Sequence, residues 1–524
     1  MIGIRTSIGA LLIALALPAV ADDVVPDTTR NYQQHCATCH APDRLGSMGP
    51  ALLPDNLARL RKGEAVKVIT GGRAATQMPA FGEVLSKDEI AALAEWIYTP
   101  VTPAPKWTES DIRASRIQQT DPASLSPKPV FSADPLNLFL VVETGDHHVS
   151  VLDGDRLEPI YRFQSRFALH GGPKFTADGR YVFFASRDGW ITKFDLWNLK
   201  VIAEVRAGIN TRNVAVSSDG RFVIAANYLP QDLVLFDADL NLVKVMDATT
   251  LDGSRSSRVS AVYDAAPRKS FVAAMKDIPE LWEISYDEKA EPIFDGYVHD
   301  YRMKEGVAKP GFLNARRTQL EDVLDDFYFD QDYRQVMGAS RKGEGQVVNL
   351  DARRKVAGLP LAGMPHLGSG ITWTWHDASG AERTVMASTN LKSGEVTVID
   401  MKTWEVIRRI PTRGPGFFLR SHENSRYAFV DSMMSREASH ILQVIDKQTL
   451  EVVKEISAEP GQTLAHVEFT RDGRYALASL WEQDGAIVVF DAQTLEEVKR
   501  IPMKKPVGKY NVWNKITRDE GTSH

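Results

Sequence analysis

The sequence predicts a small all-α domain at the N-terminal end, followed by a large all-β domain built as an eight-bladed propeller. Three observations lead to this prediction. The residues Cys36–His40 form a C-x-x-C-H motif, and a helical hydrophobic pattern follows this motif before residue 100. From about residue 130 onwards, one sequence pattern typical of β-strands recurs along the rest of the chain.

The length and charge of the chain limit the classes of protein it can belong to. With 524 residues it is too long for one ordinary domain. The formal net charge is -6, and lysines and arginines are scattered along the chain instead of clustered. We therefore do not expect nucleic acid as a partner. Small molecules or other soluble proteins are the expected partners.

Residues 1–21 are expected to be a cleaved signal peptide. Arg5 supplies the positive charge, residues 8–17 form a short apolar region, and Ala19-Val20-Ala21 is a small-x-small cleavage site. The apolar region is too short to cross a bilayer, which needs roughly 20 residues, and no other stretch is long enough. We therefore expect an exported, periplasmic protein without a membrane span.

The only two cysteines, Cys36 and Cys39, both lie in the C-x-x-C-H motif. A disulfide is the alternative in an exported protein, but redox disulfides with this spacing usually belong to a thioredoxin-like βαβ unit, which the sequence lacks. With His40 beside them, the cysteines form the signature of haem c attachment. The thiols bind the haem covalently and the imidazole binds its iron, so we expect one haem c.

Met48 and Met78 are the candidates for the sixth iron ligand. Met48 lies close to the attachment turn and would have to fold back across the haem. Met78 precedes a helix with a capping box, Ser86 and Glu89, and its loop resembles the methionine loop of class I cytochromes c. We favour Met78, and expect a class I cytochrome c domain over residues 22–100 and a proline-containing linker over 101–129.

The repeated phrase over residues 130–524 consists of a turn, often Asp-Gly, an apolar strand, a second strand ending in Asp, and a polar strand. Its spacing of about 40–48 residues is the period of a four-stranded propeller blade. Eight such turns lie near residues 134, 178, 219, 265, 331, 377, 423 and 472. We expect an insertion around Gly296 to Val323. A β-sandwich is the alternative, but it would not repeat one phrase eight times.

Three histidines lie on or near loops where a propeller binds ligands at one mouth of its channel: His170, His366 and His466. Taken singly, each such histidine is more often a hydrogen-bonded structural residue than a ligand. The phrases around them resemble the cytochrome cd1 group, whose propeller channel holds haem d1. The matching phrases are Phe175–Tyr181, Ser186–Gly189, Gly208–Arg212, Pro365–His366 and Gly508–Asn514.

The resemblance implies a role for each matching residue. His170 would bind the iron of the second tetrapyrrole from the proximal side, and His366 would cap its distal side. Arg187 and Arg212 would hold its carboxylates, for which a guanidinium group is well suited. Tyr510 and His466 correspond to family positions beside the reacting side chain.

Within the group, the chain departs from the nitrite reductases. His366 is present, but the second distal histidine is replaced in Val323–Phe327 by acids, with Asp325 in its place. Tyr510 stands where the reductases tend to have phenylalanine. The phrase Arg44–Pro54 is similar to the N-terminal domain of the dihydro-haem d1 dehydrogenases.

This similarity implies an oxidoreductase of haem d1 biosynthesis, the pathway for a cofactor of denitrification. It would oxidise a propionate side chain of dihydro-haem d1 to an acrylate, with electrons leaving through haem c to an external acceptor. Tyr510 would be the essential proton-transfer group and His466 a secondary one. Because the pKa of an ordinary tyrosine is about 10, a base role for Tyr510 requires a nearby cation.

Two other functions stay open at this point: a cytochrome cd1 nitrite reductase, and a non-enzymatic haem d1 carrier or electron-transfer cytochrome. Asp325 argues against the reductase, and Tyr510 argues against the carrier. We expect a monomer that makes transient contact with the nitrite reductase and with other d1-maturation proteins.

Overall fold

The computed structural model describes residues 26–47, 49–57, 60–72, 78–167, 169–294, 308–340, 345–361 and 363–517. The predicted signal peptide, Met48 and the side chain of His170 lie outside this description. Within it, no helix has the length and apolar character needed to cross a bilayer.

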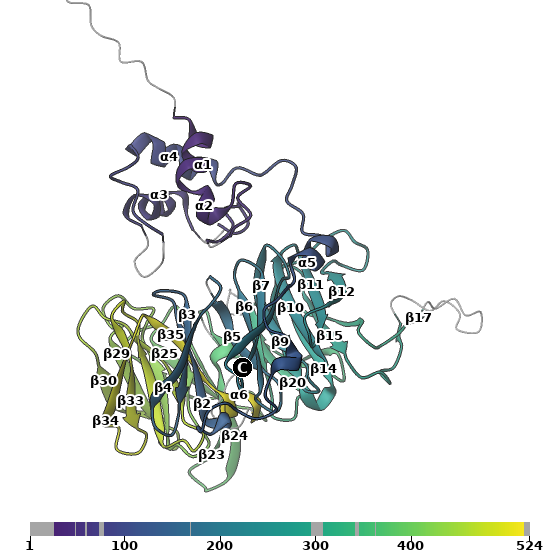
Figure 1. Ribbon diagram of the computed structural model, residues 1–524. Coiled ribbons are helices and arrows are strands. Elements are labelled where there is room, and N and C mark those ends of the chain that lie inside the picture. The colour runs from purple at the N-terminus through teal and green to yellow at the C-terminus, as the bar shows by residue number, and fades with distance from the viewer. Residues whose placement is uncertain are drawn as a thin grey trace, which may run out of the picture.

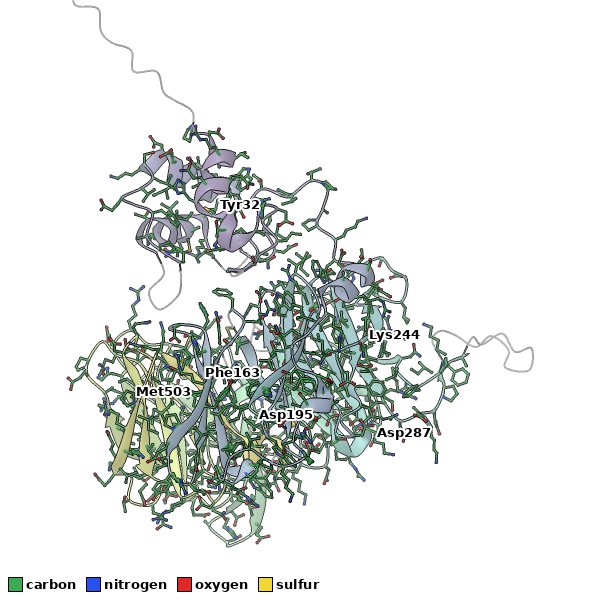
Figure 2. All side chains as sticks on the ribbon, in the orientation of Figure 1. Tyr32, Phe163, Asp195, Lys244, Asp287 and Met503 are labelled. Carbon is green, nitrogen blue, oxygen red and sulfur yellow. The ribbon has the colours of Figure 1, made fainter. Side chains whose placement is uncertain are left out.

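The N-terminal domain is all-α, as predicted, and lies above the propeller in Figure 1. Its helices are α1 (Thr28–His35), α2 (Ala37–His40), α3 (Lys62–Gly71) and α4 (Lys87–Trp96). The expected capping box opens α4: Ser86 Oγ accepts from the Glu89 backbone N–H at 3.2 Å, and the Glu89 carboxylate accepts from the Ser86 backbone N–H at 2.8 Å. Tyr32, labelled in Figure 2, is wholly buried in the core of this domain.

The large domain is an eight-bladed propeller, which confirms the predicted fold class. Each described blade is an antiparallel sheet whose first-named strand is innermost. The first four blades are β35 (Pro506–Asn511), β2 (Leu138–Glu143), β3 (His148–Asp153), β4 (Glu158–Gln164); β5 (Leu169–Phe175), β6 (Tyr181–Ser186), β7 (Trp190–Asp195), β8 (Lys200–Arg206); β9 (Asn210–Val216), β10 (Phe222–Leu229), β11 (Asp232–Asp237), β12 (Leu242–Asp247); and β13 (Val259–Ala265), β14 (Ser270–Met275), β15 (Glu280–Ser285), β18 (Ala315–Gln319).

The other four blades are β19 (Asp326–Phe329), β20 (Gln335–Ala339), β21 (Gly345–Asn349), β22 (Arg354–Leu359); β23 (Ile371–His376), β24 (Glu382–Thr389), β25 (Glu395–Asp400), β26 (Val406–Pro411); β27 (Leu419–Arg420), β28 (Tyr427–Asp431), β29 (Ile441–Asp446), β30 (Glu451–Ser457); and β31 (Leu464–Phe469), β32 (Tyr475–Leu480), β33 (Gly485–Asp491), β34 (Glu497–Met503). The ring is closed by the last strand of the chain, because β35 pairs with β2 and brings Tyr510 opposite Leu140. A final helix, α6 (Val512–Thr517), follows.

The segment between the two domains is partly structured and packs on the second blade. It contains α5 (Glu109–Ser115) and β1 (Ile117–Gln118), and β1 extends that blade by pairing with β8. Short 3₁₀ turns follow at η1 (Pro122–Ser124) and η2 (Pro135–Asn137). The indole of Trp107 donates to the Arg206 carbonyl at 2.9 Å, which ties this segment to the blade.

The predicted insertion, Gly296 to Val323, extends too far toward the C-terminus, because it includes a strand of the fourth blade. Ala315–Gln319 is the outer strand β18, which pairs with β15, so the extra residues precede it. The short pair β16 (Ile293–Phe294) and β17 (Ala308–Lys309) lies in this inserted region. The sequence ARRTQ of β18 is polar and lacks the apolar alternation of a half-buried strand, so it looked like a loop.

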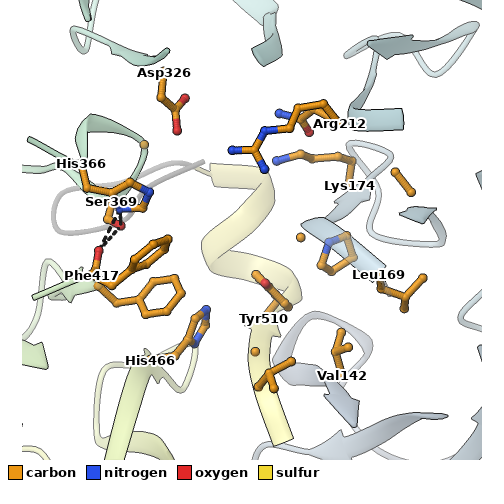
Figure 3. A pocket seen from close by; sticks show the side chains of 18 of the residues that line it. Val142, Leu169, Lys174, Arg212, Asp326, His366, Ser369, Phe417, His466 and Tyr510 are labelled. Carbon is orange, nitrogen blue, oxygen red and sulfur yellow. Dashed lines mark hydrogen bonds between the residues drawn. The ribbon is translucent and has the colours of Figure 1, made fainter. Parts of the chain in front are cut away.

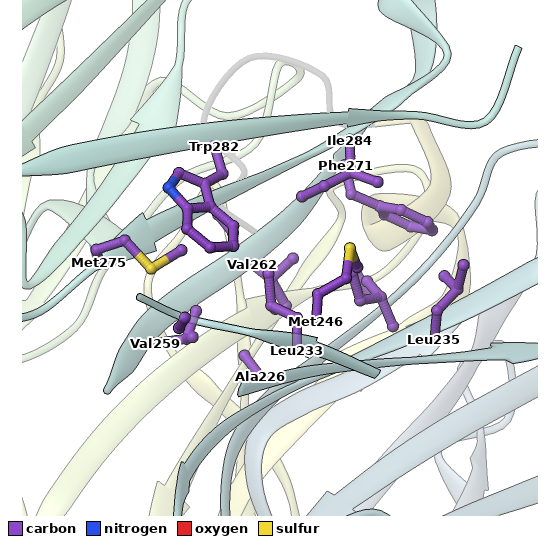
Figure 4. Packing of buried hydrophobic residues seen from close by; sticks show 14 of the residues in the cluster. Ala226, Leu233, Leu235, Met246, Val259, Val262, Phe271, Met275, Trp282 and Ile284 are labelled. Atoms are coloured by element: carbon purple, nitrogen blue, oxygen red, sulfur yellow. The ribbon is translucent and has the colours of Figure 1, made fainter. Parts of the chain in front are cut away.

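Apolar side chains of neighbouring blades interlock between the sheets. Figure 4 shows one such cluster, in which Leu233 and Leu235 of the third blade face Phe271 and Trp282 of the fourth. All four side chains are 1% exposed or less. Burial of each contributes about 2 kcal/mol, so the blades form a rigid ring that can hold polar residues at its centre.

Candidate haem and substrate sites

The predicted haem c ligands surround one cavity in the N-terminal domain. The cavity has a volume of about 200 Å³, and Cys36, Cys39, His40 and Met78 line it together. Both cysteines are free thiols. The remaining described lining is mostly apolar: Pro50, Leu52, Leu57, Leu60, Ala65, Val68, Ile69, Pro79, Phe81, Leu93 and Ile97. Such a lining is suited to a flat, apolar macrocycle that is held by covalent bonds.

The environment of His40 fits an iron ligand. Its Nδ1 lies 2.7 Å from the carbonyl oxygen of Pro50, which can only accept, so Nδ1 carries the proton and Nε2 keeps its lone pair. Burial lowers the pKa of His40, which keeps the ring neutral. A Cβ at Gly49 would lie 2.8 Å from the imidazole, so glycine is required beside it. These residues fit haem c.

The haem c cavity borders the propeller. Phe167, which belongs to the propeller chain just before β5, also lines this cavity. The two domains are further joined by Arg206, which donates to the Leu45 carbonyl at 2.6 Å, and by Ala51 and Leu53, which pack with Ile209. Only a short piece of chain therefore separates Phe167 from Leu169, which lines the second cavity.

The second cavity lies in the propeller channel and has a volume of about 290 Å³. It brings together four of the residues singled out from the sequence: Arg212, His366, His466 and Tyr510. In Figure 3, Arg212 and Lys174 lie on one side of this cavity, and His366, His466 and Tyr510 surround the rest. Inner or neighbouring strands of seven blades contribute to the described lining, and the loop before β23 contributes His366, Gly368 and Ser369.

The two other predicted residues, His170 and Arg187, are not among the described residues that line this cavity. The backbone of His170 lies in β5 opposite Ala185, a cavity residue, but its side chain is outside the described part, so its role stays a prediction. Arg187 lies in the turn between β6 and β7 and is not among the described residues that line the cavity.

His366 is held in the tautomer that a metal ligand needs. Its Nδ1 lies 2.8 Å from the carbonyl oxygen of Phe417 and 2.6 Å from Ser369 Oγ. Because the carbonyl can only accept, Nδ1 carries the proton and Nε2 has the lone pair. Burial lowers the pKa of His366 to about 4, so the ring is neutral at physiological pH.

The backbone directs His466 into the channel. The pairing of β31 with β32 slips between Ala465 and Glu468, and His466 itself has a positive φ of 53°. Bulges of this kind re-aim a side chain, and left-handed backbone in a non-glycine residue is typical of functional sites. His466 is 1% exposed, yet its Nε2 has no hydrogen-bond partner among the residues that the structure describes. A buried polar atom facing a cavity in this way is available to a ligand.

Tyr510 lies directly beside His466, with the two ring centres 5.3 Å apart. Two glycines make room for its ring, since a Cβ at Gly172 or Gly508 would come within 2.8 Å of it. The cation that a base role requires is present in Arg420, which lowers the pKa of the phenol. Burial outweighs it and raises that pKa to about 12, so the free protein holds Tyr510 as a neutral phenol.

The sequence analysis missed two cations of the cavity, Lys174 and Arg420. Together with Arg212 they come from the inner strands β5, β9 and β27. Arg420 is only 4% exposed, and its Nε has no partner among the described residues. A lysine or arginine inside the apolar first strand of a blade is the signal that could have indicated them.

The acid in the cavity is Asp326, not Asp325 as expected. Asp326 lines the cavity and accepts a hydrogen bond from the Tyr263 hydroxyl at 2.8 Å. Asp325 instead forms an ion pair with Lys276. Successive side chains of a strand point to opposite faces, so if Asp326 points into the cavity, Asp325 points away from it. Sequence alone did not establish the register.

A haem-binding propeller preceded by a haem c domain is the class of protein that these two sites define. The chain belongs to the cytochrome D1 heme domain family, whose model matches residues 133–297 and 308–515. Residues 24–97 match the model of cytochrome C oxidase, cbb3-type, subunit III.

The chain is 52% identical to dihydro-heme d1 dehydrogenase of Pseudomonas aeruginosa, over 98% of this chain and 99% of that protein. It is 25% identical to nitrite reductase of Stutzerimonas stutzeri, over 95% of each. A solved structure of dihydro-heme d1 dehydrogenase NirN in complex with DHE is similar with a TM-score of 0.83 and 52% identity, covering 93% of this chain and 99% of that one. The resemblance drawn from the motifs is confirmed.

Proposed function

We propose that the chain is a dihydro-haem d1 dehydrogenase, which oxidises a propionate side chain of dihydro-haem d1 to an acrylate. Supporting this are the identity of 52% to an enzyme of that name and the structural likeness to its complex with DHE. The observation that carries the proposal is the pair of a buried His466 and a partly buried Tyr510, which lie side by side at the channel cavity.

The cations of the cavity bind the carboxylates of the substrate. Arg212, Lys174 and Arg420 line it from three different blades, and ionic hydrogen bonds to carboxylates are roughly twice as strong as neutral ones. His366 offers its Nε2 lone pair to the substrate iron, with His170 as the predicted ligand from the other side. Rigid inner strands hold all of these groups, so the reacting side chain is oriented against His466 and Tyr510.

The reaction removes two protons and two electrons from adjacent carbons. Because His466 is neutral and its Nε2 has no partner in the described part of the chain, it can take the first proton. Tyr510 starts as a phenol, so it holds the side chain by donating a hydrogen bond and passes protons in turn. Cys36, Cys39, His40 and Met78 would hold haem c, which would supply one-electron transfer toward an external acceptor.

The two alternative functions are less well supported. The resemblance implies that nitrite reductases have a second histidine on the distal side of the iron. In this chain the corresponding segment, Val323–Phe327, instead contributes Asp326, which is hydrogen bonded to Tyr263. A carrier needs no proton-transfer group, yet His466 and Tyr510 both line the cavity.

Incubating the purified protein anaerobically with dihydro-haem d1 tests the proposal. A red-shifted absorption spectrum and a mass loss of about two hydrogens in the extracted tetrapyrrole are expected. Uptake of the tetrapyrrole without conversion would favour the carrier and overturn the proposal. Reduction of nitrite to nitric oxide would favour the reductase.

The cellular setting is part of the same proposal. The predicted signal peptide places the enzyme in the periplasm, where it would act as a monomer. We propose transient contact with cytochrome cd1 nitrite reductase, which uses the product, and with other d1-maturation proteins. Separation of periplasm from cytoplasm, followed by detection of covalent haem, tests the location.

A further inference from the structure

Asp326 is the only acid among the described residues that line the channel cavity. It belongs to β19, the inner strand of the fifth blade, and Figure 3 shows it in the same part of the cavity as Arg212 and Lys174, away from His466 and Tyr510. Like charges repel, so a carboxylate in a cavity that binds a tetrapyrrole through its carboxylates opposes that binding. The presence of this acid is therefore an electrostatic cost to affinity.

The two carboxylate oxygens of Asp326 have different surroundings. Oδ1 accepts hydrogen bonds from the Tyr263 hydroxyl at 2.8 Å and from the Phe327 backbone N–H at 2.9 Å. Oδ2 lies against the loop that holds His366, because a Cβ at Gly368 would overlap with it. The carboxylate is thus fixed from two sides, and an amide of the same shape could take its place.

Two cations of the cavity act on the charge of Asp326. Desolvation raises the pKa of this carboxyl above its usual 3.8, whereas Tyr263, Arg212 and Lys174 act to lower it. Lys174 Nζ also lies 5.3 Å from the ring centre of Tyr263, the residue that donates to Asp326. Asp326 and the two cations therefore form one electrostatic cluster around the Tyr263 ring.

The third cation of the cavity, Arg420, has its acids elsewhere. Burial lowers the pKa of Arg420, and the nearby carboxylates of Glu468 and Asp431 oppose this shift. Neither of these two acids is among the described residues that line the cavity. Within the described lining, a carboxylate thus accompanies Arg212 and Lys174 but not Arg420.

We propose that Asp326 competes with the carboxylates of the tetrapyrrole for Arg212 and Lys174, and so limits the affinity of the channel for substrate and product. In the empty channel Asp326 is a counter-ion for both cations, which lowers the cost of holding them there. A bound ligand has to share these cations with Asp326 in surroundings of low dielectric, which weakens its contacts. This inference rests on the proposed function for the identity of the ligand.

The competition affects release as well as binding. Oxidation of a propionate to an acrylate leaves every carboxylate in place, so the product meets Arg212 and Lys174 as the substrate does. Ionic hydrogen bonds are roughly twice as strong as neutral ones, and without a competing acid they would retain the product. Affinity differences between related complexes lie mostly in the dissociation rate, so we expect Asp326 to speed release of the product.

Binding of haem d1, the product, tests the proposal without turnover. Asp326→Asn removes the charge and keeps an oxygen that can accept from Tyr263. We expect the Kd from absorbance titration to fall about 10- to 100-fold, and the dissociation rate to fall with it. Asp325→Asn is the matched control and should have the Kd of wild type, because Asp325 pairs with Lys276 and is not among the described lining residues. An unchanged or raised Kd in Asp326→Asn would overturn the proposal.

Two further measurements show whether charge is the cause. The methyl ester of haem d1 has no carboxylate charge, so wild type and Asp326→Asn should bind it equally. In the Arg212→Gln background the effect of Asp326→Asn on the Kd of haem d1 should be smaller, because one contested cation is missing. A gain in affinity for the ester as large as that for haem d1 would indicate a packing effect and refute the competition.

The same proteins separate this inference from the proposed function. If Asp326→Asn binds haem d1 more tightly but wild type fails to oxidise dihydro-haem d1, the proposed dehydrogenation is refuted and the competition stands. If wild type oxidises dihydro-haem d1 and the variant binds haem d1 no more tightly, the competition alone is refuted.

Discussion

The haem c cavity and the channel cavity both accommodate a tetrapyrrole, but they are built in opposite ways. In the first, Cys36, Cys39, His40 and Met78 come from one short stretch of chain, and the rest of the described lining is mostly apolar. In the second, the lining runs from Val142 to Tyr510 and includes three cations, two histidines and one acid.

This difference follows from how each group is held. Covalent bonds and iron ligation retain a haem c, so its pocket needs little beyond apolar packing. A substrate that must enter and leave needs reversible contacts, which the cations of the channel can supply to carboxylates. The polar groups of the channel are costly to bury, and the rigid blades around them hold them in place.

The sharpest way to break this comparison is to remove the covalent attachment. We expect Cys36→Ser combined with Cys39→Ser to abolish covalent haem and to lower turnover more than about 1000-fold, because electrons lose their exit. The channel should still bind dihydro-haem d1 with a Kd within about 3-fold of wild type, since its lining is separate. Haem staining of denatured protein and absorbance titration measure the two effects. Loss of channel binding would show that the sites are not independent.

Within the channel, Tyr510→Phe should have the next largest effect. Removing the hydroxyl removes the proposed hydrogen-bond and proton-transfer group but keeps the ring between Gly172 and Gly508. We expect kcat to fall about 100- to 1000-fold, with little change in substrate affinity. Stopped-flow spectra under anaerobic conditions measure kcat. Tyr161→Phe, on the partly exposed strand β4, is the matched control and should leave kcat unchanged.

The cations of the channel should govern affinity more than rate. Arg212→Gln is expected to raise the Kd for dihydro-haem d1 about 10- to 100-fold, the effect of losing one ionic hydrogen bond. The control is Arg187→Gln, because the sequence predicted both arginines but only Arg212 lines the cavity. Equal losses in the two variants would contradict this placement.

The smallest expected effect concerns stability and pH. The pKa of His366 is about 4 in the folded protein, against 6.5 for an ordinary histidine. Between these values the unfolded chain binds a proton that the folded chain does not, so His366 lowers stability as the pH falls through that window. From pH 7 to pH 5 the loss is about 2 kcal/mol. Urea unfolding of His366→Gln should therefore show a weaker decline over this range than wild type, and an equal decline would contradict the shift.

Local sequence was sufficient to predict those features that are formed by residues close together in the chain. The C-x-x-C-H motif, the capping box at Ser86 and the turns at Asp178, Asp219 and Asp472 involve contacts between residues a few positions apart. The fold class and the haem c site were predictable from such signals. Conversely, β18 was misplaced because its pairing with β15 spans the inserted residues and its own composition is polar.

What the sequence by itself determined is therefore the haem c attachment, the number of blades and the identity of the histidines and tyrosine in the channel. Only the tertiary structure decided that Asp326 faces the cavity while Asp325 pairs with Lys276, that Arg420 and Lys174 join Arg212, and that Lys509 lies behind His466. The physical reason is closure of the ring. The meeting of β35 with β2 and β31 brings residues from opposite ends of the chain into contact, and no local pattern encodes which side chains then meet.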